Sequence, residues 1–320
     1  MRRLPLAALL AVALLAAACK PSDQGGFVVV SQPPASADAS GGAGAAASQA
    51  TASITPVIIS SQLAVGENRV VFSFLDPTSG LPVGSPDMPA AISFIAPGTT
   101  QATAPVASEF VWAIEGSRGE YIAHATFPAA GQWTAVFGVT PQGGQPEQIG
   151  VPFTVLLKPT VIAVGDKAPD TRTPVLADVG GDIHQISSDP TPDPAFYQVS
   201  VDQALAGHRP FILVFATPAF CRSAQCGPTL NQVKAASATA PASVAFINVE
   251  PYKLTFTDGR LQPVLDAQNN LIPTDVSNAW GLPTEPWIFA VDRNGVVVGS
   301  YEGIITPQEL SDVIAKIAGS

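Results

Sequence analysis

The stretch from Phe211 to Val233, FILVFATPAFCRSAQCGPTLNQV, decides how the C-terminal half of this chain folds. Its first five residues are apolar and predict a buried strand over 211–215, and apolar residues at helical spacing predict a helix over 227–238. Cys221 and Cys226 lie between the two elements. Backbone amides at a helix start stabilise a thiolate and lower the pKa of a cysteine placed there. The pair therefore indicates thiol–disulfide chemistry.

The chain around this stretch continues to alternate between strands and helices. A second buried strand is predicted over 244–249, and a hairpin over 287–291 and 296–301 turns at Asn294-Gly295. Thr306, Pro307 and Glu309 carry the signals of a capped helix start, which predicts a final helix. A Pro- and Asp-rich connection precedes the first strand, and its carboxylates are interpreted as solvated rather than as a metal site. We expect an α/β domain over 158–320.

The preceding part of the chain, residues 54–157, shows a different pattern. About seven short apolar runs are separated by turns rich in Gly and Pro, with no helical stretch between them. Regular short strands of this kind predict an antiparallel β-sandwich. The run FPAAGQW over 127–133 resembles the corner before a late strand in immunoglobulin-like domains. No chemistry is assigned to this part, which is interpreted as a spacer or binding platform.

The N-terminus predicts export and anchoring. Residues 1–18 combine Arg2 and Arg3 with an apolar segment and small residues before Cys19, which resembles a bacterial lipoprotein signal in which that cysteine is lipidated. Residues 19–53 are mostly Ala, Ser, Gly, Gln and Pro and predict a disordered tether. We therefore expect a lipid-anchored protein on the extracytoplasmic face of a bacterial membrane. The net charge of -10 argues against a nucleic-acid partner.

The order of these C-terminal motifs resembles a thioredoxin-like (redoxin) domain over about 160–320. The segment 215–221 resembles the passage from strand to active site, and CGP over 226–228 matches part of the Cys-Gly-Pro-Cys motif. EPWIF over 285–289 resembles the segment that carries the family's cis-proline, here Pro286, and VGDKAP over 164–169 resembles the first segment of exported redoxins. The resemblance implies a multi-domain fold, an immunoglobulin-like sandwich followed by a thioredoxin-like domain. It also implies an activity that needs no organic cofactor. It also implies that Pro286 presents the substrate backbone.

The spacing of the cysteines departs from the family. Five residues of regular helix would separate the two positions by about 7.5 Å along the axis, so a disulfide requires Cys221 to lie in the loop before the helix. Cys226, next to the helix start, is the preferred low-pKa thiol, although the roles reverse if Cys221 is more exposed. Glu285 or Glu250 is a candidate for proton transfer. A purely structural disulfide remains the alternative.

The first function predicted is thiol–disulfide exchange with exported protein thiols or disulfides through Cys221 and Cys226. The first rival is a copper-handling protein similar to the Sco-type chaperones, because two thiolates suit Cu(I), but no histidine follows His208. A thiol peroxidase is a weaker rival, since Ser223 stands where that family has threonine. The last is a non-catalytic binding module with a structural disulfide.

Overall fold

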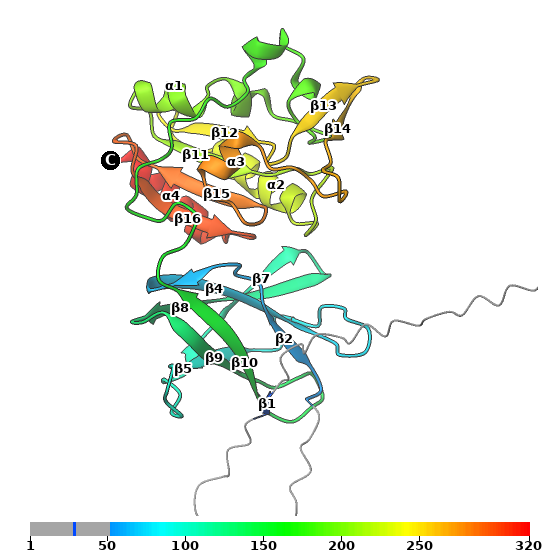
Figure 1. The fold of residues 1–320 in the computed structure, drawn as a ribbon, viewed down its shortest axis with the longest axis vertical. Coiled ribbons are helices and arrows are strands. Elements are labelled where there is room, and N and C mark those ends of the chain that lie inside the picture. Colours follow the sequence, from blue (N-terminus) through cyan, green and yellow to red (C-terminus); the bar gives the residue numbers. More distant parts are fainter. Residues whose placement is uncertain (1–27, 30–51) are drawn as a thin grey trace, which may run out of the picture.

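The computed structural model describes residues 28–29 and 52–320 (Figure 1). The expected signal peptide, the lipidation site Cys19 and most of the expected tether lie outside the described residues. Within the tether, Val28–Val29 form the short strand β1, which pairs with β10. Among the helices of the described part, none has the length and apolar character needed to cross a bilayer.

Residues 54–157 form the two-sheet domain. One sheet has the order β1-β10-β9-β5-β6, with β3 also paired to β10, and the other has the order β2-β4-β8-β7. The seven expected strands all have counterparts here. The strands of this domain after β1 are β2 (Thr55–Ile58), β3 (Leu63–Ala64), β4 (Gly66–Leu75), β5 (Ala90–Ile95), β6 (Val106–Ala107), β7 (Glu109–Ile114), β8 (Arg118–Phe127), β9 (Gly131–Val139) and β10 (Glu147–Leu156).

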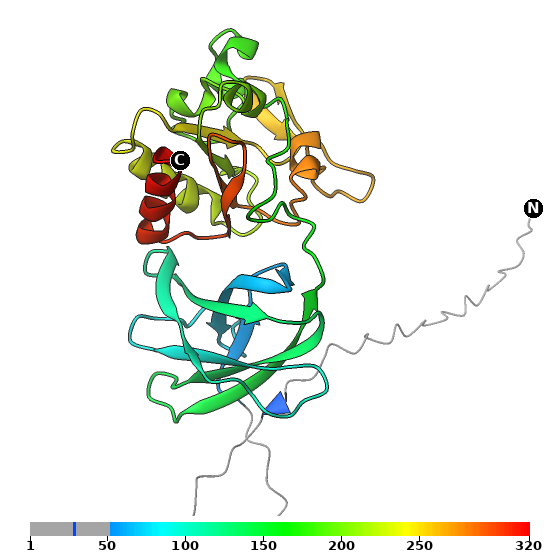
Figure 2. The same cartoon turned by 90° about the vertical axis from the view of Figure 1, so that its left-hand side faces the viewer.

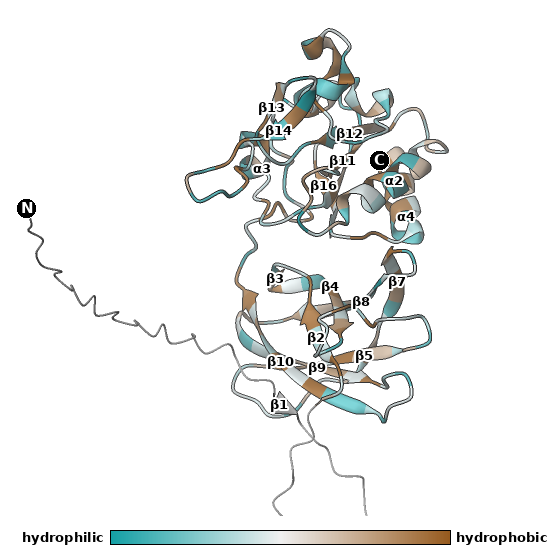
Figure 3. Ribbon diagram, turned by 90° about the vertical axis from the view of Figure 1, so that its right-hand side faces the viewer, coloured by the Kyte–Doolittle hydropathy of each residue, from teal (hydrophilic) through white to brown (hydrophobic). Residues whose placement is uncertain are grey.

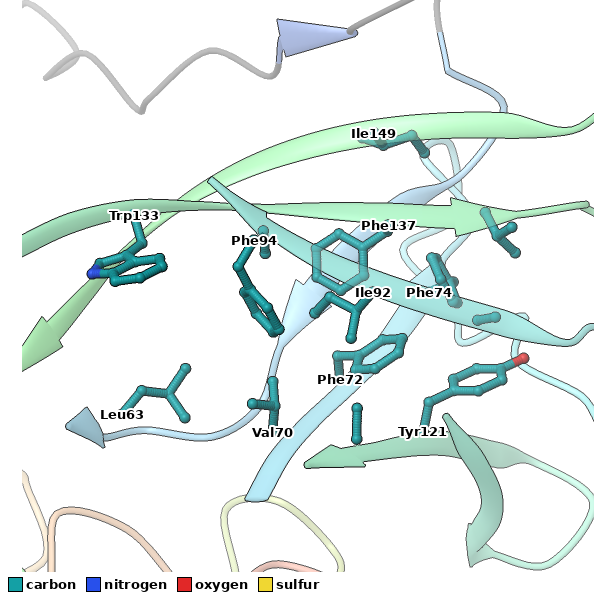
Figure 4. Packing of buried hydrophobic residues seen from close by; sticks show 14 of the residues in the cluster. Leu63, Val70, Phe72, Phe74, Ile92, Phe94, Tyr121, Trp133, Phe137 and Ile149 are labelled. Atoms are coloured by element: carbon teal, nitrogen blue, oxygen red, sulfur yellow. The ribbon is translucent and has the colours of Figure 1, made fainter. Parts of the chain in front are cut away.

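The core of the two-sheet domain lies between its sheets and is rich in aromatic rings (Figure 4). Phe72 of β4 stacks on Tyr121 of β8 with ring centroids 5.4 Å apart, and Phe137 of β9 reaches Phe72 from the other sheet at 5.0 Å. Because side chains alternate along a strand, the residues between these point to the opposite face of their sheet. That outer face carries Val71 and Ile122, which are also buried although they do not belong to this core.

Residues 158–320 form the C-terminal domain, whose main sheet has the order β12-β11-β15-β16. β11 and β12 are parallel, whereas β15 is antiparallel to both of its neighbours, β11 and β16. Its elements are η1 (Leu176–Val179), η2 (Ile183–Gln185), η3 (Pro194–Tyr197), α1 (Val201–Ala206), β11 (Phe211–Phe215), α2 (Cys226–Ser237), β12 (Ala245–Val249), β13 (Leu254–Thr257), β14 (Arg260–Pro263), α3 (Asp275–Ala279), β15 (Trp287–Val291), β16 (Val297–Glu302) and α4 (Pro307–Ala318).

The expected local elements of this domain are present. The expected hairpin is β15–β16, and the expected helix starts are α2 and α4. Thr306 Oγ1 accepts from the Glu309 amide at 3.0 Å, and the Glu309 carboxylate accepts from the Thr306 amide at 2.8 Å. α2 and α4 pack on one face of the main sheet, where α4 is drawn in red in Figure 2. Trp280 fills the other face.

The fold class expected from the sequence, an immunoglobulin-like sandwich plus an α/β thioredoxin-like domain, is wrong. The described chain is mainly β, with 36% of residues in strands and 17% in helices, distributed over several sheets. In the C-terminal domain, two of the three neighbouring strand pairs are antiparallel, and β13–β14 form a separate sheet. The sequence pattern did not show that residues 254–263 pair with each other. It also did not show that the Pro- and Asp-rich connection before β11 contains three 3-10 turns and the short helix α1.

The C-terminal domain covers the outer face of the β2-β4-β8-β7 sheet. Arg69 of β4 reaches across with Nε 2.7 Å from Oε1 of Glu309, and its Nη2 donates to the carbonyl of Ile304 at 2.7 Å. Gln62 and Thr160 exchange bonds at the connection between the domains. In Figure 3 the end of β7 lies beside α2 and α4, and α2 contacts β7 directly. Val71 and Ile122 belong to the sheet face on this side of the two-sheet domain.

Candidate functional site

The candidate site is the loop between β11 and α2, residues 216–225, which we call the disulfide loop. Cys221 lies in this loop and forms a disulfide with Cys226, the first residue of α2, with Cα atoms 5.9 Å apart. The separation is within the usual range for a disulfide. Cys221 therefore lies before the helix, as the spacing of the pair required. It is partly exposed, whereas Cys226 is fully buried.

Two hydrogen-bond donors surround the sulfur of Cys221. The backbone N–H of Cys226 donates to Cys221 Sγ at 3.2 Å, and the hydroxyl oxygen of Ser223 lies 3.3 Å from the same sulfur. A disulfide sulfur carries no hydrogen, so Ser223 is the only possible donor of that contact. The Cys226 amide belongs to the first turn of α2 and carries the partial positive charge of the helix start. Both donors favour a negatively charged sulfur on Cys221 after reduction.

Glu285 brings a carboxylate to the two sulfurs. A carboxylate oxygen of Glu285 and the sulfurs of Cys221 and Cys226 all lie within 4.8 Å of one another. Glu285 is buried and accepts the Arg222 amide at 2.9 Å, and it also accepts the hydroxyl of Tyr252. Burial raises the pKa of Tyr252, so its hydroxyl stays protonated as a donor. The site therefore contains a held carboxylate next to a disulfide.

Pro286 follows Glu285 at the start of β15. The Glu285–Pro286 peptide bond is cis. The carbonyl of Glu285 lies 3.3 Å from the Ser223 hydroxyl oxygen, so it shares the single hydroxyl hydrogen with Cys221 Sγ. The carbonyl of Pro286 accepts from the Gly303 amide at 2.9 Å. The segment 285–286, far from the cysteines in sequence, thus forms a wall of the disulfide loop.

Glu250 lies outside this cluster. It follows β12 and accepts the Ser188 amide at 2.6 Å, while its other oxygen, Oε2, is buried without a hydrogen-bond partner. Burial raises the pKa of Glu250 to about 7. Of the two carboxylates that the sequence offered for proton transfer, Glu285 is the one placed with the sulfurs.

The other polar residues considered from the sequence do not join the site. The Asp-rich loop is held by an ion pair in which Lys234 Nζ lies 2.7 Å from Asp189 Oδ2. His124 and His184 are exposed, on β8 and η2 respectively. In the described part of the chain, Cys221, Cys226 and Glu285 are the only group of three possible metal ligands found together.

Sequence reasoning missed two residues that reach the disulfide loop from the two-sheet domain. Arg118 Nη1 donates to the Ser223 carbonyl at 2.6 Å, and the Glu120 carboxylate accepts from the side-chain amide of Gln225. The available signal was the Arg118-Gly119-Glu120 run in a chain with only 12% charged residues. The burial of Glu120 could not be foreseen, because β8 alone predicts that its outer face is solvated.

Comparison with known proteins gives no family. No protein-family model matches the chain, and no curated protein matches it. Among solved structures, a proposed glycoside hydrolase from Bacteroides vulgatus matches 70% of this chain and 40% of its own, at 10% identity and a TM-score of 0.21. The match therefore spans about two fifths of that protein's length. A similarity at this level carries no argument about fold or activity.

Proposed function

We propose that this protein is a thiol–disulfide oxidoreductase that exchanges disulfides with exported proteins through Cys221 and Cys226. The observation that carries the proposal is the position of the partly exposed Cys221 sulfur between two donors, with the Glu285 carboxylate beside both sulfurs. A disulfide that served only as a clasp would not need these groups. The arrangement is also the feature that relates the site to the redoxins: a cysteine pair at a helix start, opposite a proline segment.

The partial exposure of Cys221 and the two hydrogen bonds to its sulfur favour Cys221 as the residue that reacts with the substrate. A substrate thiolate attacks Cys221 Sγ, the bond between Cys221 and Cys226 breaks, and Cys226 leaves with the electron pair. A second substrate thiol then attacks the mixed disulfide, which releases Cys221 as a thiolate and leaves the substrate oxidised. The protein gains two electrons and two protons in this exchange, and the reverse sequence reduces a substrate disulfide.

Glu285 is the proposed proton carrier for this exchange. Cys226 is fully buried, so the thiolate that it forms on leaving is poorly solvated and gains from protonation. The Glu285 carboxylate can take the proton that the attacking substrate thiol gives up and pass it to Cys226, because it lies within 4.8 Å of both sulfurs. The Arg222 amide and the Tyr252 hydroxyl hold the carboxylate in place.

The proposal is tested by the redox equilibrium of the disulfide in the full-length protein. The chain has three cysteines, so in a Cys19→Ser variant only Cys221 and Cys226 remain. This variant is equilibrated in graded thiol buffers, free thiols are alkylated, and the mass is measured. A reversible two-electron transition above about −300 mV is expected, since inert structural disulfides lie below that value. A bond that stays oxidised while the protein is folded would refute the oxidoreductase proposal.

The proposed location is the extracytoplasmic face of a bacterial membrane, with Cys19 as the lipid-bearing residue. Export would place the cysteine pair in a compartment where disulfides persist. The expected result is that the protein fractionates with membranes and that Cys19→Ala releases it. Membrane association that is unchanged in Cys19→Ala would contradict the lipid anchor.

A second candidate is metal handling by the reduced site. Reduction of the disulfide would leave two thiolates and the Glu285 carboxylate within 4.8 Å of one another. Thiolates suit Cu(I), as the Sco-type alternative requires. Titration of the reduced protein with Cu(I) under argon, competed by a chelator, would show stoichiometric binding that is lost in Cys221→Ser. Weak binding that does not depend on Cys221 would exclude this candidate.

A further inference from the structure

The two-sheet domain contacts the disulfide loop at two successive points. Arg118 of β8 donates from Nη1 to the carbonyl of Ser223 at 2.6 Å. Two residues further along the same strand, Glu120 accepts from the side-chain amide of Gln225. Both contacts join residues more than 100 positions apart in the sequence. In both, the loop residue is one of the four that lie between Cys221 and Cys226.

The second contact is fully enclosed. Glu120 is 0% exposed and Gln225 is 2% exposed, so neither group can exchange its partner for water without separating the domains. Glu120 also lies near Arg118, with Arg118 Nε 3.5 Å from Glu120 Oε1. A buried carboxylate without partners is costly, and here its partners are this arginine and the loop glutamine. Burial raises the pKa of Glu120 to about 7.

The residue between the two contacts has an unfavourable backbone conformation. Ala224 has φ of 62°, in the left-handed region that a side chain disfavours. Such a conformation is unfavourable for a residue with a side chain and persists where neighbouring contacts enforce it. The bonds to Ser223 and Gln225 flank Ala224 on both sides, so the two-sheet domain enforces this shape of the loop.

The shape of the loop determines what reaches Cys221. With its carbonyl fixed by Arg118, Ser223 has its hydroxyl 3.3 Å from Cys221 Sγ. Gln225 immediately precedes Cys226, whose amide is the second donor to that sulfur at 3.2 Å. Arg118 therefore contacts the residue that carries one donor to this sulfur, and Glu120 contacts the residue immediately before the other donor.

We propose that Arg118 and Glu120 are positioning residues of the disulfide site, so that the two-sheet domain sets the reactivity of Cys221. They act through Ser223 and Gln225 and touch no reacting atom themselves. This inference rests on the proposed function, in which Cys221 is the sulfur that reacts with the substrate. The two-sheet domain, in which the sequence shows no chemistry, thereby becomes part of the catalytic unit.

The test measures the thiol pKa of Cys221 in a full-length Cys19→Ser, Cys226→Ser background, from the pH dependence of its alkylation rate. Cys226→Ser keeps the amide that donates to Cys221. Arg118→Ala is expected to raise the thiol pKa of Cys221 by about one unit, because the Ser223 hydroxyl is no longer held against the charged thiolate and that hydrogen bond is lost. Alkylation then becomes about tenfold slower at pH values below the pKa. Arg118→Lys keeps the charge and is expected to restore part of the rate.

A double-mutant cycle tests the route through Ser223. Ser223→Ala removes the hydroxyl and leaves the Arg118 contact to the backbone carbonyl, and it is expected to raise the thiol pKa by a similar amount. In the Ser223→Ala background, Arg118→Ala should then add less than half of its separate effect. Full additivity of the two changes would overturn the proposed route.

Glu120 is tested with one conservative variant and one truncation. The side chain of Glu120→Gln can still accept from the side-chain amide of Gln225. Glu120→Ala leaves that buried amide without a partner, so only this variant is expected to slow the alkylation of Cys221, by several-fold. Arg209→Ala is the matched control, since Arg209 also bonds backbone carbonyls, at Ala242 and Ser243, outside the disulfide loop. It is expected to leave the thiol pKa unchanged.

The outcomes separate this inference from the function on which it rests. If the parent disulfide cycles reversibly but folded Arg118→Ala keeps the parent thiol pKa, the positioning role is wrong and the oxidoreductase stands. An equal shift in Arg209→Ala would also overturn the positioning role. If the parent disulfide does not cycle, the oxidoreductase itself fails. Should Arg118→Ala not fold, Arg118→Lys and the Glu120 pair still decide the matter by the same alkylation measurement.

Discussion

The backbone amide of Cys226 donates to the sulfur of Cys221 at 3.2 Å, so the first turn of α2 points its positive end at the other cysteine of the pair. The helix start was expected to activate Cys226, which adjoins it in sequence. In the structure, however, Cys226 is fully buried, and its amide points at the sulfur of the partly exposed Cys221. The sequence left open that the roles of the two cysteines reverse, and this geometry favours the reversal.

The roles of the two cysteines can be separated by trapping. Cys226→Ser is expected to accumulate a mixed disulfide between Cys221 and a substrate or a small-molecule disulfide, because the resolving sulfur is missing. Cys221→Ser should accumulate several-fold less, since Cys226 is shielded from solvent. Non-reducing electrophoresis and mass measurement of the trapped species provide the readout. Equal or greater trapping by Cys221→Ser would make Cys226 the attacking residue.

Glu285→Gln tests the proton transfer. The amide keeps the shape of the side chain but cannot carry the proton, so exchange should slow at least about tenfold at neutral pH. Stopped-flow reduction of the disulfide, repeated from pH 5 to 9, measures the rate and its pH profile. Glu250→Gln is the matched control, because Glu250 is also a buried carboxylate but lies outside the sulfur cluster. An unchanged profile in Glu285→Gln would remove Glu285 from the mechanism.

Glu250 makes the stability of the fold depend on pH. Burial raises its pKa from 4.5 to about 7, so the folded state holds a proton that the unfolded state releases between these values. Stability from this group is therefore complete below about pH 4.5 and falls as the pH rises through 7. The difference corresponds to about 3 kcal/mol at most.

Replacing that carboxylate should remove the part of the pH dependence that Glu250 contributes. Glu250→Gln is expected to be more stable than the parent at pH 8 and close to it at pH 4, measured by urea unfolding at each pH. The Gln side chain can still accept the Ser188 amide. If the stability difference between variant and parent is the same at both pH values, the carboxylate is not destabilised by burial.

Arg69 should hold the two domains together. Its Nε and Nη2 bond the two carboxylate oxygens of Glu309 at 2.7 and 3.0 Å, and both side chains are largely buried. Removing one partner of such a pair leaves the other charge uncompensated, which typically costs about 3–5 kcal/mol. Arg69→Ala is thus expected to lower the urea midpoint clearly, while Arg209→Ala, an exposed arginine, changes it little. Matching midpoints for the two variants would show that this ion pair does not stabilise the interface.

The sequence by itself determined most local elements. Alternating and helical apolar spacing located seven strands of the two-sheet domain, β11, β12, the β15–β16 hairpin, α2 and α4, because each pattern depends on neighbours in the chain. The short strands β1, β3 and β6 were not predicted. The capped start of α4 at Thr306 and Pro307 followed from local hydrogen bonding. The spacing of Cys221 and Cys226 required the first cysteine to lie before the helix, and it does.

Tertiary structure decided the class of the fold and the composition of the site. The mixed main sheet and the separate β13–β14 sheet depend on pairings between distant strands, which a local pattern does not encode. The same holds for Glu285, brought to the sulfurs from 59 positions beyond Cys226 in sequence, and for Arg118 and Glu120, brought from another domain. Charge and burial at these positions follow from which surfaces meet, and only the folded chain brings those surfaces together.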